Sequence, residues 1–223
     1  MDPSRAYRHF CAMARSLDLL GERWSLLVVR DLLLGPRRFS DLERSLGGIT
    51  PTRLTQRLRH LQTAGVVERD RPRGRREAWY RLTEAGRDLG VVVDALTLWG
   101  IQHGALAVRP GEPVRPEHVM NGTKVWLTWR QARPRAPVHW VWRFPAEEPY
   151  TLRFDGTAWQ LTRGDAAQAD AHVVVQTTPQ AWAGFLTTPP PERRLPDRGI
   201  HLTATPAARA EFAAAFDVSP RAG

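Results

Sequence analysis

The feature that most constrains the fold is a break in sequence texture between residues 105 and 119. Within it, Val108–Pro116 holds three Pro and a Gly, which oppose regular structure. Before the break, apolar residues recur at helical spacing. After it, short alternating runs rich in Trp, Val and Thr are typical of strands. The sequence therefore predicts an α+β chain with a domain at 1–104, a linker at 105–119 and a second domain at 120–223.

Composition excludes several classes of protein. With 42% apolar and 25% charged residues, the chain is neither disordered nor fibrous. No apolar run approaches the roughly 18 residues of a membrane span, and the first residues lack the apolar region of a signal peptide. We therefore expect a cytoplasmic protein with no membrane partner. The single cysteine, Cys11, excludes an internal disulfide framework and cysteine-rich zinc sites. We also predict no metal and no cofactor.

The positive charge of the chain is localised. The net charge is +9, and the segment from Arg37 to Arg81 holds 12 Arg against 5 acidic residues. A basic stripe on a small fold indicates a polyanionic partner, most often nucleic acid.

Cap and stop signals predict four helices before residue 65. The first spans Ala6–Leu20, and the second spans Trp24–Leu34 before Gly35-Pro36. A capping box at Ser40–Glu43 opens the third, and Thr50-Pro51 opens the fourth, which runs to Ala64. Two short helices around a Gly-Gly turn are typical of a helix-turn-helix.

The fourth helix has an outer face without acidic residues. Leu54, Leu58 and Leu61 share one narrow arc, which we expect to face the core. Arg and Gln pair bidentately with guanine and adenine edges in the major groove. We predict base contacts from Thr52, Arg53 and Gln56 and phosphate contacts from Arg57 and Arg59, with Ser40 and Thr50 also at the DNA. The alternative is a solvated basic helix face.

A hairpin with a basic tip follows the fourth helix. Val66–Asp70 and Glu77–Leu82 are predicted strands, joined by Arg71–Arg76. A hairpin directly after a recognition helix is a wing. We predict backbone or minor-groove contacts from Arg73, Arg75 and Arg76, with a loop that has no partner as the alternative.

The predicted helix 83–103 carries a seam of heptad type. Its members are spaced alternately three and four residues apart: Leu82, Ala85, Leu89, Val92, Leu96, Trp99 and His103. We predict a homodimer formed by the first helix and helix 83–103, although the first helix of the same chain is an alternative partner for the seam. A two-fold dimer would read an inverted repeat in double-stranded DNA.

These residues resemble the HxlR-type winged helix-turn-helix regulators over residues 6–104. The segments that carry the resemblance are Cys11, Leu17–Trp24, Arg37–Leu42, Gly48–Thr50, Leu54–Leu58, Leu61, Gly65–Val67 and Tyr80–Gly86. The resemblance implies a dimeric transcription factor whose fourth helix and wing contact double-stranded DNA. The wing tip departs from the family, which usually has an apolar, Pro-containing stretch where this chain is Arg-rich.

Cys11 occupies the position that some members of that family use as a thiol sensor. Arg8 and Arg15 lie near it at helical spacing, which favours a thiolate. The alternative is a buried, inert thiol.

The second half predicts a sheet that is apolar on one face. The alternating positions are Val125, Leu127 and Trp129; Val138, Trp140, Trp142 and Phe144; Leu152 and Phe154; Trp159 and Leu161; and Val173 and Val175. Asp155-Gly156 predicts a tight hairpin, and much of the sheet is expected to be an antiparallel meander. Helices at Pro179–Leu186 and Pro206–Phe216 and a strand at Gly199–Thr205 complete an α+β layer.

From Val173 to Phe216 the chain also resembles the C-terminal part of a sterol-carrier-protein-like domain, which implies an apolar ligand between sheet and helices. The aromatic residues predicted to line such a pocket, for an apolar effector, are Trp126, Trp140, Trp142, Trp182, Phe185 and Phe212. The alternative is that these rings form a plain core.

Two other functions compete with a regulator. The chain has no H-E-x-x-H, no G-x-S-x-G and no Gly-rich phosphate loop after a strand, so we predict that it is not an enzyme. The remaining rival is a carrier of lipids or small apolar molecules, in which the N-terminal domain serves only dimerisation. The sequence favours a DNA-binding regulator, which we expect to be a repressor.

Overall fold

A computed structural model describes residues 7, 10–70, 78–103, 109, 111–164, 171–189, 192–195 and 199–218. The chain divides into two compact units, Met1–Ala95 and Leu96–Gly223. The division falls inside a helix, nine residues before the boundary predicted at 104. In the described part of the chain, no helix is both long and apolar enough to cross a membrane.

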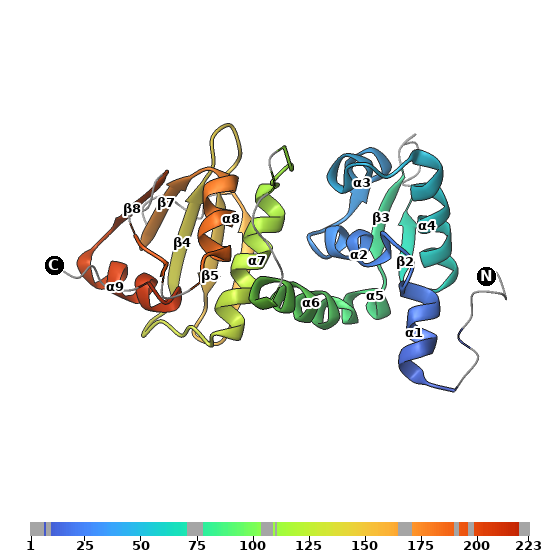
Figure 1. The fold of residues 1–223 in the computed structure, drawn as a ribbon, viewed down its shortest axis with the longest axis horizontal. Coiled ribbons are helices and arrows are strands. Elements are labelled where there is room, and N and C mark those ends of the chain that lie inside the picture. The colour runs from blue at the N-terminus through green and yellow to red at the C-terminus, as the bar shows by residue number, and fades with distance from the viewer. Residues whose placement is uncertain are drawn as a thin grey trace. The chain divides into compact units, whose positions relative to one another are not determined.

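The N-terminal unit is a helical bundle against a small sheet (Figure 1). Its helices are α1 (Ala12–Leu20), α2 (Ser25–Leu33), α3 (Phe39–Leu46), α4 (Pro51–Thr63), α5 (Glu84–Asp88) and α6 (Gly90–His103), of which α6 continues into the second unit. Its strands are β1 (Arg37–Arg38), β2 (Val67–Asp70) and β3 (Trp79–Leu82), in the order β1-β3-β2 with antiparallel pairing throughout. The predicted helix-turn-helix and hairpin are therefore present, and the helix predicted over 83–103 is interrupted at Leu89.

Helix α3 starts differently from the prediction. The sequence suggested a capping box with Ser40 as the cap, but the helix begins at Phe39 and Ser40 lies exposed in its first turn. The Asp41 carboxylate instead accepts a hydrogen bond from the backbone N–H of Arg38, at 3.2 Å. The helix begins two residues earlier than predicted because β1 pairs with β3 up to Arg38, and the chain enters the first turn of α3 directly after this strand.

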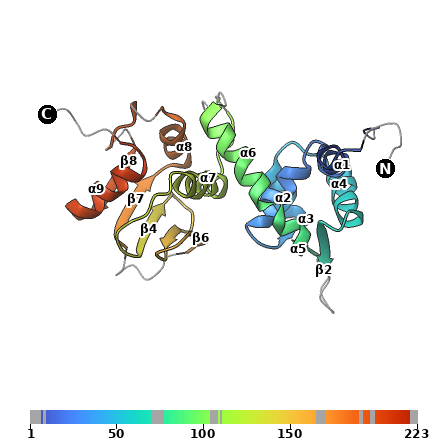
Figure 2. The same cartoon turned by 90° about the horizontal axis from the view of Figure 1, so that it is seen from below.

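The C-terminal unit packs three helices along a five-stranded sheet (Figures 1 and 2). Its elements are α7 (Pro116–Trp129), β4 (Val138–Arg143), β5 (Tyr150–Phe154), β6 (Trp159–Arg163), β7 (Val173–Thr177), α8 (Pro179–Thr187), β8 (Ile200–Ala204) and α9 (Pro206–Ala215). The predicted hairpin at Asp155-Gly156 joins β5 to β6, and the Asp155 carboxylate accepts backbone hydrogen bonds from Thr157 and Ala158. The α+β class is confirmed.

The strand predicted at Val125, Leu127 and Trp129 is wrong, because these residues lie in α7. Because α7 is buried on nearly all sides, its apolar residues do not show the helical period. The apolar residues at alternate positions then resemble those of a strand. Pro116 occupies the first turn of α7, a position that proline favours, so the helix also takes up the end of the predicted linker.

The sheet has the order β6-β5-β4-β7-β8. Its β6-β5-β4 part is the antiparallel meander that was expected, but β4 and β7 pair in parallel, with Trp140 opposite Val173. Residues at alternate positions of all five strands face α7, α8 and α9 and form one core with them.

Candidate nucleic-acid interface

Helix α4 is fixed in rotation by its ends and by its leucines. The Thr50 hydroxyl accepts a hydrogen bond from the Arg53 N–H at 3.3 Å, and Pro51 occupies the first helical position. Leu54, Leu58 and Leu61 are buried in the core of the N-terminal unit, as predicted. The cap and the leucines together decide which side chains of α4 face outward.

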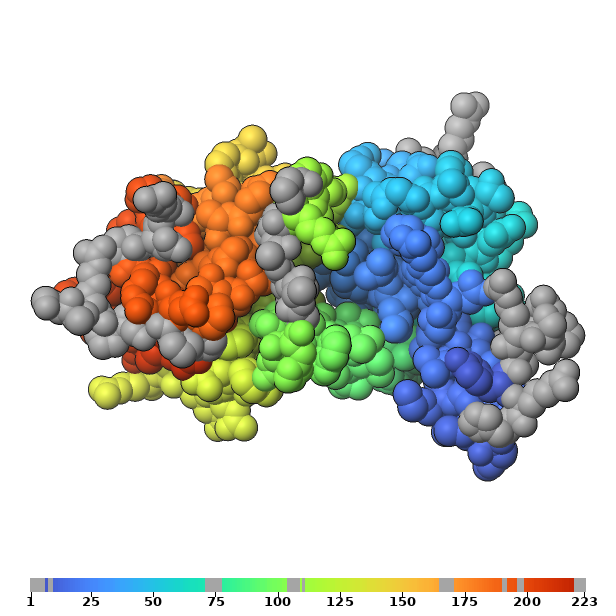
Figure 3. Space-filling model, viewed as in Figure 1, coloured from blue at the N-terminus to red at the C-terminus, as the bar shows by residue number. Residues whose placement is uncertain are grey.

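The outer face of α4 carries exposed polar and basic side chains. Thr52, Arg53, Gln56 and Arg59 are all exposed, and α4 contains no acidic residue. The atoms of α4 lie open at the surface of the unit (Figure 3). The structure thus brings together on one face the three residues predicted to contact bases and one of the two predicted to contact phosphates.

Arg57 has a different environment from the one predicted. Its guanidinium donates to the Glu22 carboxylate at 3.0 Å, and its side chain is only 14% exposed. One turn on, the His60 ring nitrogen Nε2 lies 3.0 Å from the Leu19 carbonyl oxygen. Both contacts join α4 to the end of α1 and the turn that follows. In this structure Arg57 therefore helps to position α4, and its predicted phosphate contact stays a prediction.

The other residues predicted to contact DNA are Ser40, Thr50 and three arginines at the wing tip. Ser40 is exposed on α3, whereas the Thr50 side chain is exposed but already holds the cap of α4. The wing-tip residues Arg73, Arg75 and Arg76 lie outside the described residues.

The base of the wing carries arginines that the sequence analysis did not single out. Arg38 lies over the ring of Trp79, with its guanidinium carbon 4.7 Å from the ring centroid, and Arg69 lies over Tyr80 at 5.9 Å. Stacking on a ring restricts the orientations of a guanidinium group. The sequence gives no local signal for these two pairs, because each arginine is distant in sequence from its ring.

The six aromatic side chains predicted to line a ligand pocket are buried in the core of the C-terminal unit. Their rings contact one another closely: the ring centroids of Trp140 and Phe212 are 4.9 Å apart, and those of Trp182 and Phe185 are 4.8 Å apart and stacked. Three surface hollows bounded by described residues include none of the six. In this structure the six rings therefore form a plain core, which was the alternative to a ligand pocket.

Cys11 is the N-cap residue of α1, is partly exposed and has a free thiol. Its role as a sensor stays a prediction. Among the described residues, no group of three or more His, Cys, Asp or Glu side chains is arranged to hold a metal ion.

Known proteins resemble the first half of the chain. The family model described as HxlR-like helix-turn-helix matches residues 19–107. An HTH-type transcriptional regulator of Mycobacterium tuberculosis is 42% identical over 110 residues, which are 48% of this chain and 66% of that protein. A Synechocystis HTH-type transcriptional regulator is 38% identical over 96 residues, covering 43% of this chain and 71% of the relative.

Solved structures of transcriptional regulators also match part of the chain. The reduced form of the transcriptional regulator YodB from B. subtilis is 31% identical with a TM-score of 0.38, covering 47% of this chain and all of YodB. The redox regulator HypR in its reduced form is 29% identical with a TM-score of 0.41, covering 43% of this chain and 95% of HypR. By the extent of the sequence matches, the chain belongs to the HxlR-like helix-turn-helix family.

Proposed function

We propose that the protein is a DNA-binding transcriptional regulator that reads double-stranded DNA with α4. The observation that carries the proposal is the outer face of α4, which is exposed, free of acidic residues and fixed in rotation by the cap at Thr50 and three buried leucines. Such a face suits a helix inserted in the major groove, where Arg and Gln recognise base edges. Relatives that match this half of the chain are HTH-type transcriptional regulators, which supports the proposal.

DNA binding is tested by fluorescence anisotropy with an operator selected from genomic fragments, at several salt concentrations. Counterion release predicts that log K falls linearly with log salt concentration. Gln56→Ala should lower discrimination at one base pair by about 1–3 kcal/mol, whereas Arg59→Ala should weaken binding to all sequences alike and reduce the salt slope by about 1.

Thr63→Ala, at the exposed far end of α4, is the control and should change neither property. Binding that does not depend on salt would contradict the proposal. If Gln56→Ala and Arg59→Ala had the same effect on every sequence, the division into base and phosphate contacts would be wrong.

We further propose a homodimer formed through α6 and α1. Of the predicted seam on α6, Val92, Leu96 and Trp99 are 41%, 52% and 61% exposed, and Met13 on α1 is 71% exposed. Large apolar side chains at heptad spacing on a helix surface favour burial against another helix, and an isologous dimer buries the same face twice. Two copies of α4 related by a two-fold axis would recognise an inverted repeat.

Trp99→Glu should convert the dimer to a monomer, because it places a charge in the seam. Light scattering after gel filtration measures the mass, and anisotropy should show loss of binding to the inverted repeat. Gln102→Glu adds the same charge at an exposed position outside the seam and should leave the dimer intact. A Trp99→Glu protein that remained dimeric would contradict this interface.

We also propose that the protein represses transcription, because a dimer bound to its operator excludes other proteins from the same duplex. The last part of the proposal is that an effector of the regulator binds to the C-terminal unit. The carrier alternative gains no support from the aromatic core, because its rings pack against one another.

A further inference from the structure

The turn between α1 and α2, residues 21–24, lies against α4 in the N-terminal unit. The two helices α1 and α4 lie side by side (Figures 1 and 2). The Arg57 guanidinium donates to the Glu22 carboxylate at 3.0 Å, and His60 Nε2 lies 3.0 Å from the Leu19 carbonyl oxygen. The turn therefore brings a carboxylate to a helix that has no acidic residue of its own.

Backbone contacts hold this turn in one conformation. The Gly21 N–H donates to the Leu17 carbonyl at 2.7 Å, and the Ser25 N–H donates to the Glu22 carbonyl at 3.1 Å. Trp24 has a φ of 81° and a ψ of −18°, in the left-handed region. That conformation is unfavourable for a residue other than glycine and persists only where the surrounding structure enforces it. The backbone that carries Glu22 is therefore fixed beside α4.

Arg57 lies on the flank of α4, between the buried leucines and the outer face. At 100° per residue it is about 60° around the helix from Leu54 and about 100° from Gln56. The walls of the major groove are phosphate backbones, so the flanks of an inserted helix lie nearest to phosphates. A guanidinium without a partner at this position would suit a phosphate contact.

The other two arginines of α4 differ from Arg57 in their partners. Arg53 and Arg59 are exposed, and neither forms an ion pair with another described residue. A cation that binds a phosphate releases condensed counterions, which supplies much of the affinity for any duplex. The charge of Arg57 is instead balanced by the Glu22 carboxylate.

We propose that Glu22 is a positioning residue for DNA binding and acts through Arg57. The ion pair holds the Arg57 guanidinium at the α1–α2 turn and balances its charge, so α4 binds DNA with one phosphate contact fewer than its arginines could make. Because phosphate contacts form on every sequence, Glu22 limits the affinity for DNA as a whole and leaves the choice of sequence to the outer face of α4. This inference rests on the proposed function.

The test is fluorescence anisotropy of the full chain with a labelled duplex of mixed sequence, at salt concentrations from about 50 to about 200 mM. Glu22→Gln keeps the size of the side chain and removes its charge, so Arg57 becomes available to a phosphate. The slope of log K against log salt concentration should become steeper by about 0.9 for each α4 on the DNA. The variant should bind more tightly than the wild type, and this gain should be about threefold greater at the lowest salt concentration than at the highest.

The double variant Glu22→Gln/Arg57→Gln should return the salt slope to that of the wild type, because it removes the charge that Glu22→Gln made available. A purely structural role of Glu22 would not change the slope in this pattern. Thermal unfolding should show both proteins folded, with Tm within about 5 °C of the wild type, because an exposed ion pair contributes little to stability.

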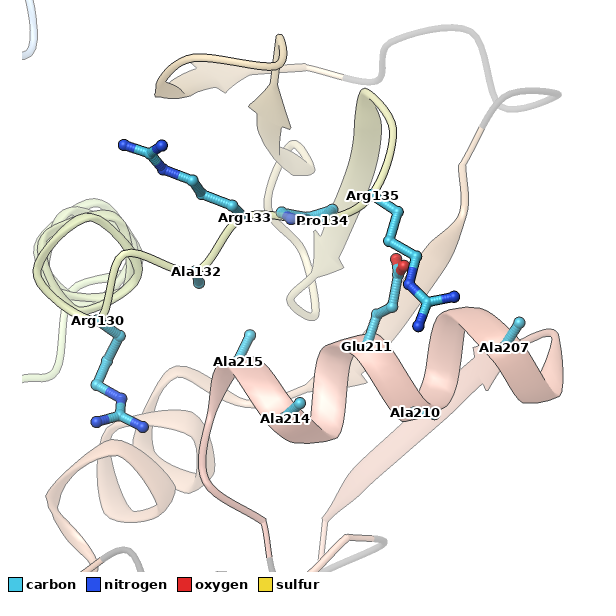
Figure 4. Close-up of a pocket in the computed structure, with 10 residues that line it drawn as sticks. All are labelled: Arg130, Ala132, Arg133, Pro134, Arg135, Ala207, Ala210, Glu211, Ala214 and Ala215. Atoms are coloured by element: carbon cyan, nitrogen blue, oxygen red, sulfur yellow. The ribbon is translucent and has the colours of Figure 1, made fainter.

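Glu211→Gln is the matched control. Glu211 lies on α9 beside Arg135, in the C-terminal unit (Figure 4). The control therefore raises the net charge by one next to an arginine, as Glu22→Gln does, but not at α4. It should leave the salt slope unchanged.

Three results would overturn the role of Glu22. The first is a Glu22→Gln protein with the slope of the wild type. The second is a double variant as steep as Glu22→Gln, which would show that Arg57 is not involved. The third is a double variant less steep than the wild type, which would show that Arg57 already contacts a phosphate in the presence of Glu22.

The proposed function fails separately. A wild-type protein that bound the duplex without dependence on salt, or did not bind it, would contradict the regulator itself. Salt-dependent binding by the wild type together with an unchanged slope in Glu22→Gln would contradict only the role of Glu22.

Discussion

Replacing Arg193 with methionine will destabilise the C-terminal unit by about 3–5 kcal/mol, which is large for one substitution. Arg193 is 2% exposed and donates to three backbone carbonyls: Leu186 at 2.7 Å, Thr188 at 2.9 Å and Phe216 at 3.0 Å. These oxygens lie at the ends of α8 and α9, where carbonyls have no partner within the helix and where positive charge is favoured. One side chain therefore caps two helices.

The guanidinium of Arg193 is also stacked, with its central carbon 4.2 Å from the ring centroid of Trp126. Burial lowers the pKa of Arg193 to about 10, so the side chain keeps its charge at neutral pH. Methionine fills similar volume without a donor and leaves the buried carbonyls unsatisfied, at about 1–3 kcal/mol each before any rehydration.

Urea unfolding gives the change in free energy, and hydrogen exchange by mass spectrometry assigns it to peptides from α8 and α9. Arg193→Lys should recover only part of the stability, because an ammonium lacks the planar fork. The control Arg153→Met, at an exposed position of β5, should cost no more than about 0.5 kcal/mol. A cost for Arg193→Met as small as that of the control would show that the three hydrogen bonds add nothing to stability.

Gly86→Ala will destabilise the N-terminal unit by about 3 kcal/mol, although alanine is the better helix former. A Cβ at Gly86 would lie 2.1 Å from the Val66 carbonyl oxygen and 3.1 Å from the Leu82 side chain. The carbonyl has no freedom to retreat, since it accepts hydrogen bonds from the backbone N–H and the hydroxyl of Thr83. Thr83 in turn caps α5, so a shift would disturb the junction between the end of α4, the sheet and α5.

Differential scanning calorimetry should show a fall in Tm of about 12 °C or more for Gly86→Ala, from the usual scaling for a domain of this size. Gly184→Ala is the matched control. It also lies within a helix, α8, but a Cβ there has no neighbour within 4 Å, and it should stabilise its unit by about 0.5–1 kcal/mol. An unchanged or raised Tm for Gly86→Ala would mean that α5 moves away from β2 at little cost.

Local signals were sufficient for most of the fold. Thr50-Pro51 begins α4 and Thr205-Pro206 begins α9 because the hydroxyl cap and the proline at the first helical position act through neighbouring residues. Asp155-Gly156 likewise sets a turn from its own side-chain hydrogen bonds. What could not be predicted depends on distant parts of the chain: α7 is buried on nearly all sides, and α3 begins where β1 leaves β3.

The candidate DNA interface shows the same division. The helical period identified the outward positions Thr52, Arg53, Gln56 and Arg59, because Leu54, Leu58 and Leu61 fix the rotation of the helix. It could not distinguish Arg57, whose partner Glu22 is distant in sequence. Neither could it show that the aromatic residues of the second half would contact each other instead of a ligand, since alternation is the same in both cases.

The parallel pairing of β4 with β7 sets the order in which the C-terminal sheet assembles. The β4-β5-β6 meander joins strands that are neighbours in the chain, so forming it loses little chain entropy. The pairing of β4 with β7 closes a longer loop, because two strands lie between them in the chain, and it is therefore slower. We expect the meander to form early and the addition of β7 with β8 to limit the rate of folding. Until then the β4 edge is open to strands of other chains, and a nascent chain is most prone to aggregate in that interval.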